Sequence, residues 1–361
     1  MTVSPLARAP RRVLVLCTRR LGDVLLTTPL LRSLRRAWPE ATLDVLTLQW
    51  SASALEGNPD VSRVIPIAQK ASVRESLRAI GGFRRYDLAV STLHDDRPHA
   101  LALWAAGTRV NITPPVANGA WWKRRLSTRS APLGEMHTVV QYLRLADALG
   151  LPRCNEVVPP RVAAGAEPPT PAAPYVVVHP GAMFTYKRWT VAGWQAVLRW
   201  LVGQGLHVLL DAGPGEVERM QVEAILRDSG LPEGAVTAPS QVLSFAQLAS
   251  LMAAARLYIG PDTGVTHLAA ATGVPTIALF GSMSPLRWGP WPQGFAGSGP
   301  SPWREHAPLQ HASKVWIVQG LTHCAPCLLE GCERHPASRA DCLDQLPASR
   351  VIAAAAAALA G

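Results

Sequence analysis

The strongest constraint on the fold is a regular alternation of short apolar runs with segments of helical periodicity. Runs of strand length in the first half of the chain are Val13–Cys17, Thr42–Leu48, Arg63–Ile67, Asp87–Thr92 and Arg109–Ile112. Between most of these runs, apolar residues recur every three or four positions, as expected for helices packed on one face. Strands that alternate with helices favour a parallel sheet covered by helices.

A proline-rich stretch interrupts this alternation at residues 152–174, and the pattern restarts at Tyr175–His179. Proline-rich chain is semi-rigid and continues neither helix nor strand, so we expect an interdomain linker there. A chain of 361 residues also exceeds one comfortable hydrophobic core. We therefore predict an α/β protein with a first domain at 1–151, a linker at 152–174 and a second domain at 175–361, with a cleft between the domains.

The net positive charge of the chain lies in the first half. Residues 1–150 carry 21 Lys and Arg against 11 Asp and Glu, whereas residues 151–361 carry 14 of each. A basic half suits an anionic membrane surface or an anionic acceptor, and a solvated basic face is the structural alternative. Nucleic acid is disfavoured as a partner, because no zinc-finger or RNP-type motif accompanies the charge.

Neither a membrane span nor a secretory signal is expected. No apolar run approaches the ~18–20 residues that a transmembrane helix needs, and the apolar stretch near the start is only five residues long. The sequence therefore predicts a cytoplasmic protein. Peripheral contact with the inner face of the cytoplasmic membrane is compatible with the basic first half.

The segment "PDTGVTHLAA" at residues 261–270 places polar residues where an apolar strand becomes a helix. The first amides of a helix, together with its dipole, attract anions. We therefore predict an anion site at Asp262, Thr263 and Gly264. His267 lies one helical turn further on and is expected to contact the same ligand, the alternative being a histidine satisfied within the core.

Two further groups in the second half suit a phosphorylated ligand. Lys187 and Arg188 precede a predicted helix, where they can neutralise phosphate oxygens; the alternative is a surface ion pair anchored by Trp189. In "LLDAGPGEVER", Glu216 or Glu218 can accept hydrogen bonds from ribose hydroxyls. An ordinary glycine-rich turn is the alternative at this second motif.

Asp23 stands out in the first half because it follows the first strand directly, in "TRRLGDVLLTTP". Gly22 permits a tight turn there. Asp23 is then either a helix cap or a catalytic base at the carboxyl end of the strand. The dinucleotide-binding fingerprint is not met, since this turn has one glycine instead of three.

Four of the six cysteines cluster near the C-terminal end, with the spacing CxxC-x4-C-x9-C, at Cys324, Cys327, Cys332 and Cys342. In a reducing compartment such clustering favours metal ligation, and we expect a structural zinc. Two disulfides, an iron–sulfur site and a metal-free loop are the alternatives. The acidic pair in "HDD" at 94–96 resembles a cation site, but it lies in the other half from the phosphate-binding groups, and no metal is expected there.

Taken together, these motifs resemble those of glycosyltransferase family 9, the ADP-heptose:lipopolysaccharide heptosyltransferases. The likeness covers about residues 12–345 and is most specific in "DTGVTHLAAATGVPTIALFG" and "GDVLLTTP". It implies a GT-B fold, in which two Rossmann-like domains face each other across a cleft. The first domain would bind mainly the acceptor, and the second would bind the nucleotide-sugar.

The resemblance also implies a reaction and the residues that perform it. Asp23 would be the base of an inverting transfer, and Lys187 would neutralise the departing pyrophosphate. Asp262, Thr263, Gly264 and His267 match the donor site, and Glu216 is a looser match to a ribose-binding acid. The implied partners are an ADP-sugar donor and a lipopolysaccharide core or other envelope glycan as acceptor, with no cofactor required for catalysis.

Other functions remain open at this point. A GT-B enzyme of different activity, such as a UDP-sugar hexosyltransferase or an epimerase, fits the same motifs. So does a nucleotide-sugar-binding module without catalysis. The loop at residues 282–293 contains no residue pattern that identifies heptose as the donor sugar.

Overall fold

The computed structural model describes residue 6 and residues 8–113, 121–171, 174–239, 241–295, 299–320 and 322–361, without the side chains of residues 121, 122 and 124. The chain forms two compact units, Met1–Pro160 and Arg161–Gly361. Within the described ranges, no helix combines the length and apolar character needed to cross a bilayer.

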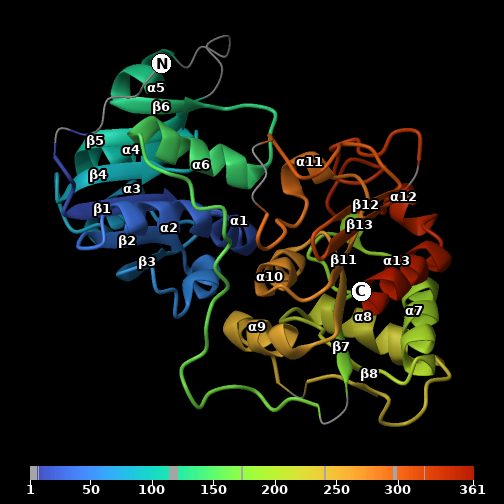
Figure 1. The fold of residues 1–361 in the computed structure, drawn as a ribbon. Coiled ribbons are helices and arrows are strands. Elements are labelled where there is room, and N and C mark those ends of the chain that lie inside the picture. Colours follow the sequence, from blue (N-terminus) through green and yellow to red (C-terminus); the bar gives the residue numbers. More distant parts are fainter. Residues whose placement is uncertain are drawn as a thin grey trace. The chain divides into compact units, whose positions relative to one another are not determined.

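The first unit is built on a parallel six-stranded sheet of order β3-β2-β1-β4-β5-β6 (Figure 1). Its strands are β1 Arg12–Cys17, β2 Thr42–Leu48, β3 Arg63–Ile67, β4 Tyr86–Ser91, β5 Ala106–Thr113 and β6 Arg129–Pro132. The five strands predicted here are confirmed, and β6 was not predicted. This strand order is that of the Rossmann fold.

The helices of the first unit are α1 Leu21–Leu26, α2 Thr28–Ala37, the 3-10 helix η1 Gln49–Leu55, α3 Val73–Ala79, α4 Asp96–Ala105, α5 Trp121–Leu126 and α6 Thr138–Leu149. α2 packs with α6, and α3 packs with α4. The helical segment that follows β1 is divided into two helices, α1 and α2. Pro29 has no N–H to offer the carbonyl of Leu25, and the hydroxyl of Thr28 donates to that carbonyl instead (2.7 Å).

The chain leaves α6 through Gly150, which adopts the left-handed conformation typical of a helix C-terminus (φ 73°). The start of the predicted linker then packs on α2. The backbone N–H of Cys154 donates to Ser33 Oγ, and that of Val158 donates to Thr28 Oγ1, both at 2.9 Å. Residues up to Pro160 therefore belong to the first unit, which proline content alone did not indicate.

The second unit repeats this architecture with a seven-stranded sheet of order β12-β13-β11-β10-β7-β8-β9. Its strands are β7 Tyr175–Val178, β8 His207–Leu210, β9 Val236–Thr237, β10 Leu257–Pro261, β11 Thr276–Phe280, β12 Leu309–Ala312 and β13 Val315–Gln319. All neighbours are parallel except the β12–β13 pair. Apart from β12, the strands again have the Rossmann order.

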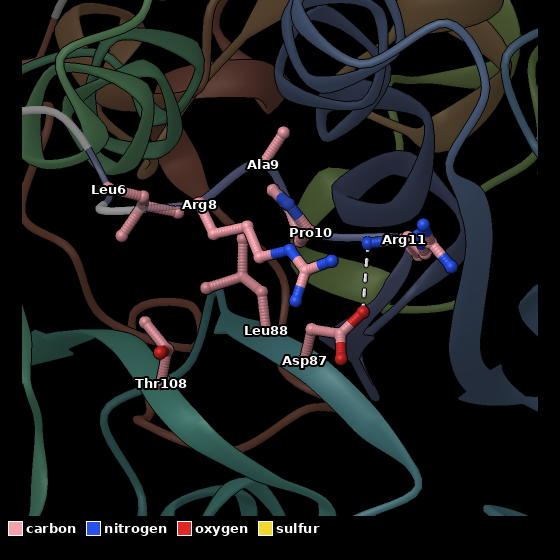
Figure 2. Close-up of a pocket in the computed structure, with 8 residues that line it drawn as sticks. All are labelled: Leu6, Arg8, Ala9, Pro10, Arg11, Asp87, Leu88 and Thr108. Carbon is pink, nitrogen blue, oxygen red and sulfur yellow. Dashed lines mark hydrogen bonds between the residues drawn. The ribbon is translucent and has the colours of Figure 1, made fainter.

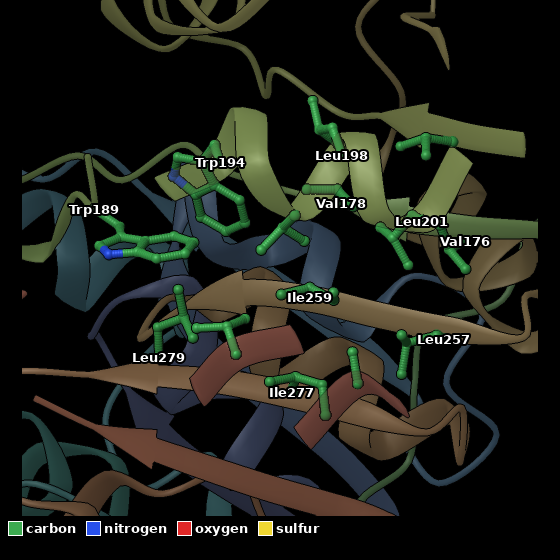
Figure 3. Close-up of a cluster of buried hydrophobic side chains, with 14 of the residues drawn as sticks. Val176, Val178, Trp189, Trp194, Leu198, Leu201, Leu257, Ile259, Ile277 and Leu279 are labelled. Atoms are coloured by element: carbon green, nitrogen blue, oxygen red, sulfur yellow. The ribbon is translucent and has the colours of Figure 1, made fainter. Parts of the chain in front are cut away.

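The helices of the second unit are η3 Thr185–Lys187 (3-10), α7 Val191–Gly203, α8 Glu216–Leu226, α9 Phe245–Ala254, α10 Gly264–Thr272, α11 Pro285–Trp288, α12 Asp341–Asp344 and α13 Ala348–Ala360. Side chains of α7 and α13 pack on the sheet in one buried apolar cluster (Figure 3). Trp189 and Trp194 lie edge to face within it, with ring centroids 5.2 Å apart. This core holds the carboxyl ends of β7 and β10 in fixed positions.

Candidate functional site

Each sheet has one point where successive strands depart in opposite directions. In the first unit this switch point lies between β1 and β4, and in the second it lies between β7 and β10. In open α/β sheets, ligands bind outside the carboxyl ends of the strands at such a point. Most of the residues predicted for function follow one of these strands.

Asp262 follows β10 at the second switch point and contacts Lys187 of η3. Lys187 Nζ lies 2.5 Å from Asp262 Oδ2 and 3.2 Å from the Asp262 carbonyl oxygen. The Asp262 side chain is 7% exposed and that of Lys187 is 18% exposed. A small hollow beside this pair is also lined by Tyr186, Ser282 and Met283. The structure thus joins two predicted residues that are 75 positions apart in sequence.

Thr263 is the N-cap of α10, and its side chain makes no capping hydrogen bond. The amides at the start of α10 therefore lack the intramolecular side-chain acceptor that many helices provide. Gly264 is the first residue of the helix. The amino end of α10 is thus available to an anion, beside the ammonium group of Lys187.

His267 is buried one turn into α10, and its Nδ1 has no hydrogen-bond partner among the described residues. Burial lowers the pKa of its imidazole to about 4. The Asp262 carboxylate opposes this lowering, and the Lys187 charge adds to it. The ring is therefore neutral near pH 7. Its ability to donate or accept one hydrogen bond is not consumed by the protein.

Arg188 follows Lys187 but has different contacts. Its Nε donates to the carbonyl of Ala182 (2.8 Å), which fixes the loop after β7. Burial lowers the pKa of the Arg188 guanidinium, and the charge of Glu218 opposes this effect. Arg188 therefore lies near Glu218 and has a structural hydrogen bond of its own.

The two candidate ribose-binding acids are distinguished by their positions on α8. Glu216 begins the helix and is exposed. Glu218 is half-buried and folds back over Gly215, where a Cβ would overlap its carboxylate. It also packs against Gly181, after β7, where a Cβ would come within 2.9 Å of its Cγ. Glu218 is thus the acid that lies against the carboxyl ends of the strands.

A buried pair that we did not predict lies beneath this turn. His179 follows β7 and Asp211 follows β8, and His179 Nδ1 lies 2.7 Å from Asp211 Oδ2. Both side chains are less than a tenth exposed. The sequence signal available for this pair was that each residue directly follows an apolar run of strand length. Sequence spacing alone does not reveal that the two strands are neighbours.

Asp23 lies at the switch point of the first unit, as the third residue of α1. Arg20 is the N-cap of that helix, so Asp23 is not its capping residue. The hydroxyl of Tyr142 on α6 lies close to the Asp23 carboxylate. Burial and the Asp23 charge raise the pKa of this tyrosine well above its usual range. The phenol therefore stays protonated and can only donate to the carboxylate.

His94, Asp95 and Asp96 follow β4, the other strand at this switch point. Asp96 forms an ion pair with Lys123 of α5 (2.7 Å), whose Nζ also donates to the carbonyl of His94 (2.8 Å). In the described part of the chain, no three His, Cys, Asp or Glu side chains come together as metal ligands. Asp96 accordingly has a lysine as its charged neighbour.

The zinc is expected at Cys324, Cys327, Cys332 and Cys342, which differ in exposure. Cys342 packs in an apolar cluster with Tyr186. Burial raises the pKa of its thiol to about 12, and the charges of the three other cysteines nearby add to this effect. Cys324 and Cys332 are exposed. The zinc site therefore stays a prediction, and the sequence spacing did not reveal that Cys342 faces the core.

A larger hollow of about 350 Å³ lies at the opposite edge of the first sheet, at the amino ends of β4 and β5 (Figure 2). Arg8, Leu88 and Thr108 line it. Asp87 also borders it and accepts hydrogen bonds from the backbone of Arg11 (2.8 Å) and Arg12 (2.9 Å), which sets the entry into β1. No residue predicted for function lies there.

Comparison with known proteins agrees with the order of the strands and with the motifs. The model of "Glycosyltransferase family 9 (heptosyltransferase)" matches residues 84–304. Lipopolysaccharide heptosyltransferase 3 of Escherichia coli is 30% identical over 75% of this chain and 83% of its own. Lipopolysaccharide heptosyltransferase 1 of Pseudomonas aeruginosa is 30% identical over 90% of this chain and 88% of its own.

A solved structure shares the fold. E. coli heptosyltransferase WaaC with ADP superposes with a TM-score of 0.69 and 19% identity, over 96% of this chain and 99% of that chain. The likeness confirms the predicted GT-B fold class. The family match and the sequence relatives confirm the predicted resemblance and identify an enzyme. The chain belongs to glycosyltransferase family 9, the heptosyltransferase family.

Proposed function

We propose that the protein transfers heptose from ADP-heptose to a hydroxyl of a lipopolysaccharide core, with inversion at the anomeric carbon. The observation that carries this proposal is the Lys187–Asp262 pair at the amino end of α10, at the switch point of the second sheet. The names of the relatives, lipopolysaccharide heptosyltransferases 1 and 3, support the acceptor class. The ADP held by WaaC supports the nucleotide.

In the proposed donor site, the diphosphate lies against the amino end of α10. The amides that follow Thr263, together with Lys187, would stabilise the negative charge that grows as ADP departs. Groups placed in advance of the reaction stabilise such charge without reorganisation. Asp262 would hold the lysine in position, and neutral His267 would exchange a hydrogen bond with the donor. Arg188 supplies a second positive charge nearby.

We propose that Glu218 binds the ribose hydroxyls of the donor. It is half-buried against Gly181 and Gly215, whereas Glu216 is exposed. A carboxylate at this place would accept hydrogen bonds from vicinal hydroxyls, as acids after the second strand do in dinucleotide-binding sheets.

Asp23 is proposed as the base. The acceptor oxygen bonds to the anomeric carbon, its proton passes to the Asp23 carboxylate, and the bond from that carbon to the phosphate oxygen breaks, leaving its electron pair on ADP. An aspartate of ordinary pKa ~3.9 is a weak base for an alcohol, so proton transfer would come late, when the forming bond has acidified the hydroxyl. Tyr142 would keep the carboxylate oriented. This reaction requires the acceptor hydroxyl to reach the anomeric carbon of the bound donor.

The first unit is proposed to bind the acceptor. It is also proposed to associate peripherally with an anionic membrane, because a lipid-linked acceptor is presented at a membrane surface. Residues 1–150 carry the whole net charge. Phe83 (61% exposed) and Trp104 (38% exposed) stack edge to face with centroids 5.1 Å apart, and Arg84 lies over the Phe83 ring. Exposed aromatic rings beside arginine suit the interface of an anionic bilayer.

The test is turnover by the purified protein with ADP-heptose and a panel of lipopolysaccharide cores truncated before each successive heptose. We expect heptose transfer to one member of the panel, and NMR of the product should show the anomeric configuration opposite to that of the donor. UDP-hexoses serve as competing donors. Faster transfer from a UDP-sugar, or a product with the donor's configuration, would overturn the corresponding part of the proposal.

A further inference from the structure

The carboxyl ends of β7 and β8 are joined by the His179–Asp211 pair described above. His179 Nδ1 and Asp211 Oδ2 lie 2.7 Å apart, and both side chains are buried. The backbone N–H of His179 also donates to the carbonyl of Ile259 in β10 (3.0 Å). His179 therefore ties β8 to the two strands that flank the switch point.

The imidazole ring lies beneath the glycine-rich turn that follows β8. Gly213 adopts a left-handed conformation (φ 72°), and a Cβ there would lie 3.4 Å from His179 Cε1. The other Asp211 oxygen, Oδ1, accepts from the backbone N–H of Gly213 (3.4 Å). One carboxylate thus contacts both the ring and the backbone of the turn.

The same turn carries Glu218 toward the strands. Its carboxylate folds over Gly215, and its Cγ packs on Gly181, two residues after His179. The pair therefore fixes both segments between which Glu218 is held. Nothing in the proposed chemistry uses the pair itself, and its burial would be costly without a partner for each polar group.

We propose that His179 and Asp211 act as a positioning pair, which holds the 212–218 turn so that Glu218 meets the ribose of the donor nucleotide. This inference rests on the proposed function. It concerns nucleotide binding, so its test can be separated from sugar transfer.

The test measures the binding of ADP, 2′-deoxy-ADP, 3′-deoxy-ADP and pyrophosphate by calorimetry. We expect the intact protein to prefer ADP to at least one deoxy analogue. In Asp211→Asn and His179→Gln, ADP should bind about tenfold more weakly, the loss of one hydrogen bond to a charged group. The preference for the ribose hydroxyl should largely disappear, whereas pyrophosphate binding should be unchanged. The double variant should be no weaker than either single variant, because the two residues act as one unit.

Tyr175→Phe is the matched control. It removes another buried hydrogen bond at the opposite end of β7, from the Tyr175 hydroxyl to the carbonyl of Leu251 (2.6 Å). It should lower the Tm without changing selectivity for the ribose. Should the pair variants fail to fold, Gly215→Ala displaces the Glu218 carboxylate directly and should lose the same selectivity.

Two results would overturn the inference. One is an Asp211→Asn variant that retains full discrimination between ADP and the deoxy analogues. The other is a Gly215→Ala variant that retains the same discrimination. If the intact protein binds no ADP at all, the proposed donor is wrong, and that failure is visible before any variant is measured.

Discussion

Lys187 Nζ lies 2.5 Å from Asp262 Oδ2 and 3.2 Å from the carbonyl oxygen of the same residue. The lysine approaches from η3 and the aspartate from the end of β10, so the pair fastens the loop after β7 to the amino end of α10. An ammonium held in this way is preorganised, and its charge is only partly exposed to solvent.

We expect Lys187→Ala to lower kcat/KM for sugar transfer by about 10²- to 10³-fold, because it removes a charge positioned for the leaving diphosphate. Binding of ADP should weaken as well, which calorimetry would detect. Lys314→Ala, at an exposed lysine of the same unit, is the control and should behave as the wild type. Equal activity of the two variants would remove Lys187 from the mechanism.

Asp23→Asn should lower kcat by at least ~100-fold while leaving ADP binding nearly unchanged, since the amide cannot take the acceptor's proton. Steady-state kinetics and calorimetry on the same preparation would check this. Asp23→Glu keeps the carboxylate and should restore part of the rate. A normal turnover rate in the asparagine variant would show that another group is the base.

His267 should make the stability of the protein depend on pH. Its pKa is about 4 in the folded protein and ~6.5 in the unfolded chain, so the unfolded state binds the proton more readily. The stabilisation is complete above about pH 6.5 and is lost as the pH falls toward 4. The Tm of the wild type should therefore drop more steeply than that of His267→Gln over this range. His323→Gln, at an exposed histidine, should follow the wild type.

The two core tryptophans should respond differently to the same substitution. Trp189 Nε1 donates to the carbonyl of Leu346 (3.0 Å), whereas the buried Trp194 Nε1 has no partner among the described residues. Trp189→Phe leaves a carbonyl unsatisfied and should cost about 1–3 kcal/mol more than Trp194→Phe in the free energy of unfolding. Urea denaturation of both variants measures the difference. A larger loss for Trp194→Phe would contradict this account.

Vesicle flotation would test the proposed membrane surface. The wild type should float with vesicles that contain phosphatidylserine and remain behind with neutral phosphatidylcholine vesicles, because each basic residue near the anionic surface contributes about 1 kcal/mol. Phe83→Ala combined with Trp104→Ala should abolish most of the binding. Trp50→Ala removes another exposed tryptophan of the first unit, in η1, and should leave vesicle binding intact. Binding that survives the double substitution would place the surface elsewhere.

The sequence alone determined the α/β class, the positions of most strands and the family. These follow from local information, since the hydrophobic period of a segment reports its own secondary structure and motifs such as "DTGVTHLAA" are contiguous. It also placed Asp23 and Asp262 just beyond strands and Lys187 just before a helix. Rules that concern neighbouring residues were sufficient for each of these conclusions.

Only the tertiary structure decided which residues meet. The contact of Lys187 with Asp262 and that of His179 with Asp211 depend on strand order, because β7 lies between β8 and β10. The position of Glu218 over Gly215 and the burial of Cys342 depend on packing in the same way. Such contacts join segments far apart in the chain, and the spacing of residues along a sequence carries no direct record of them.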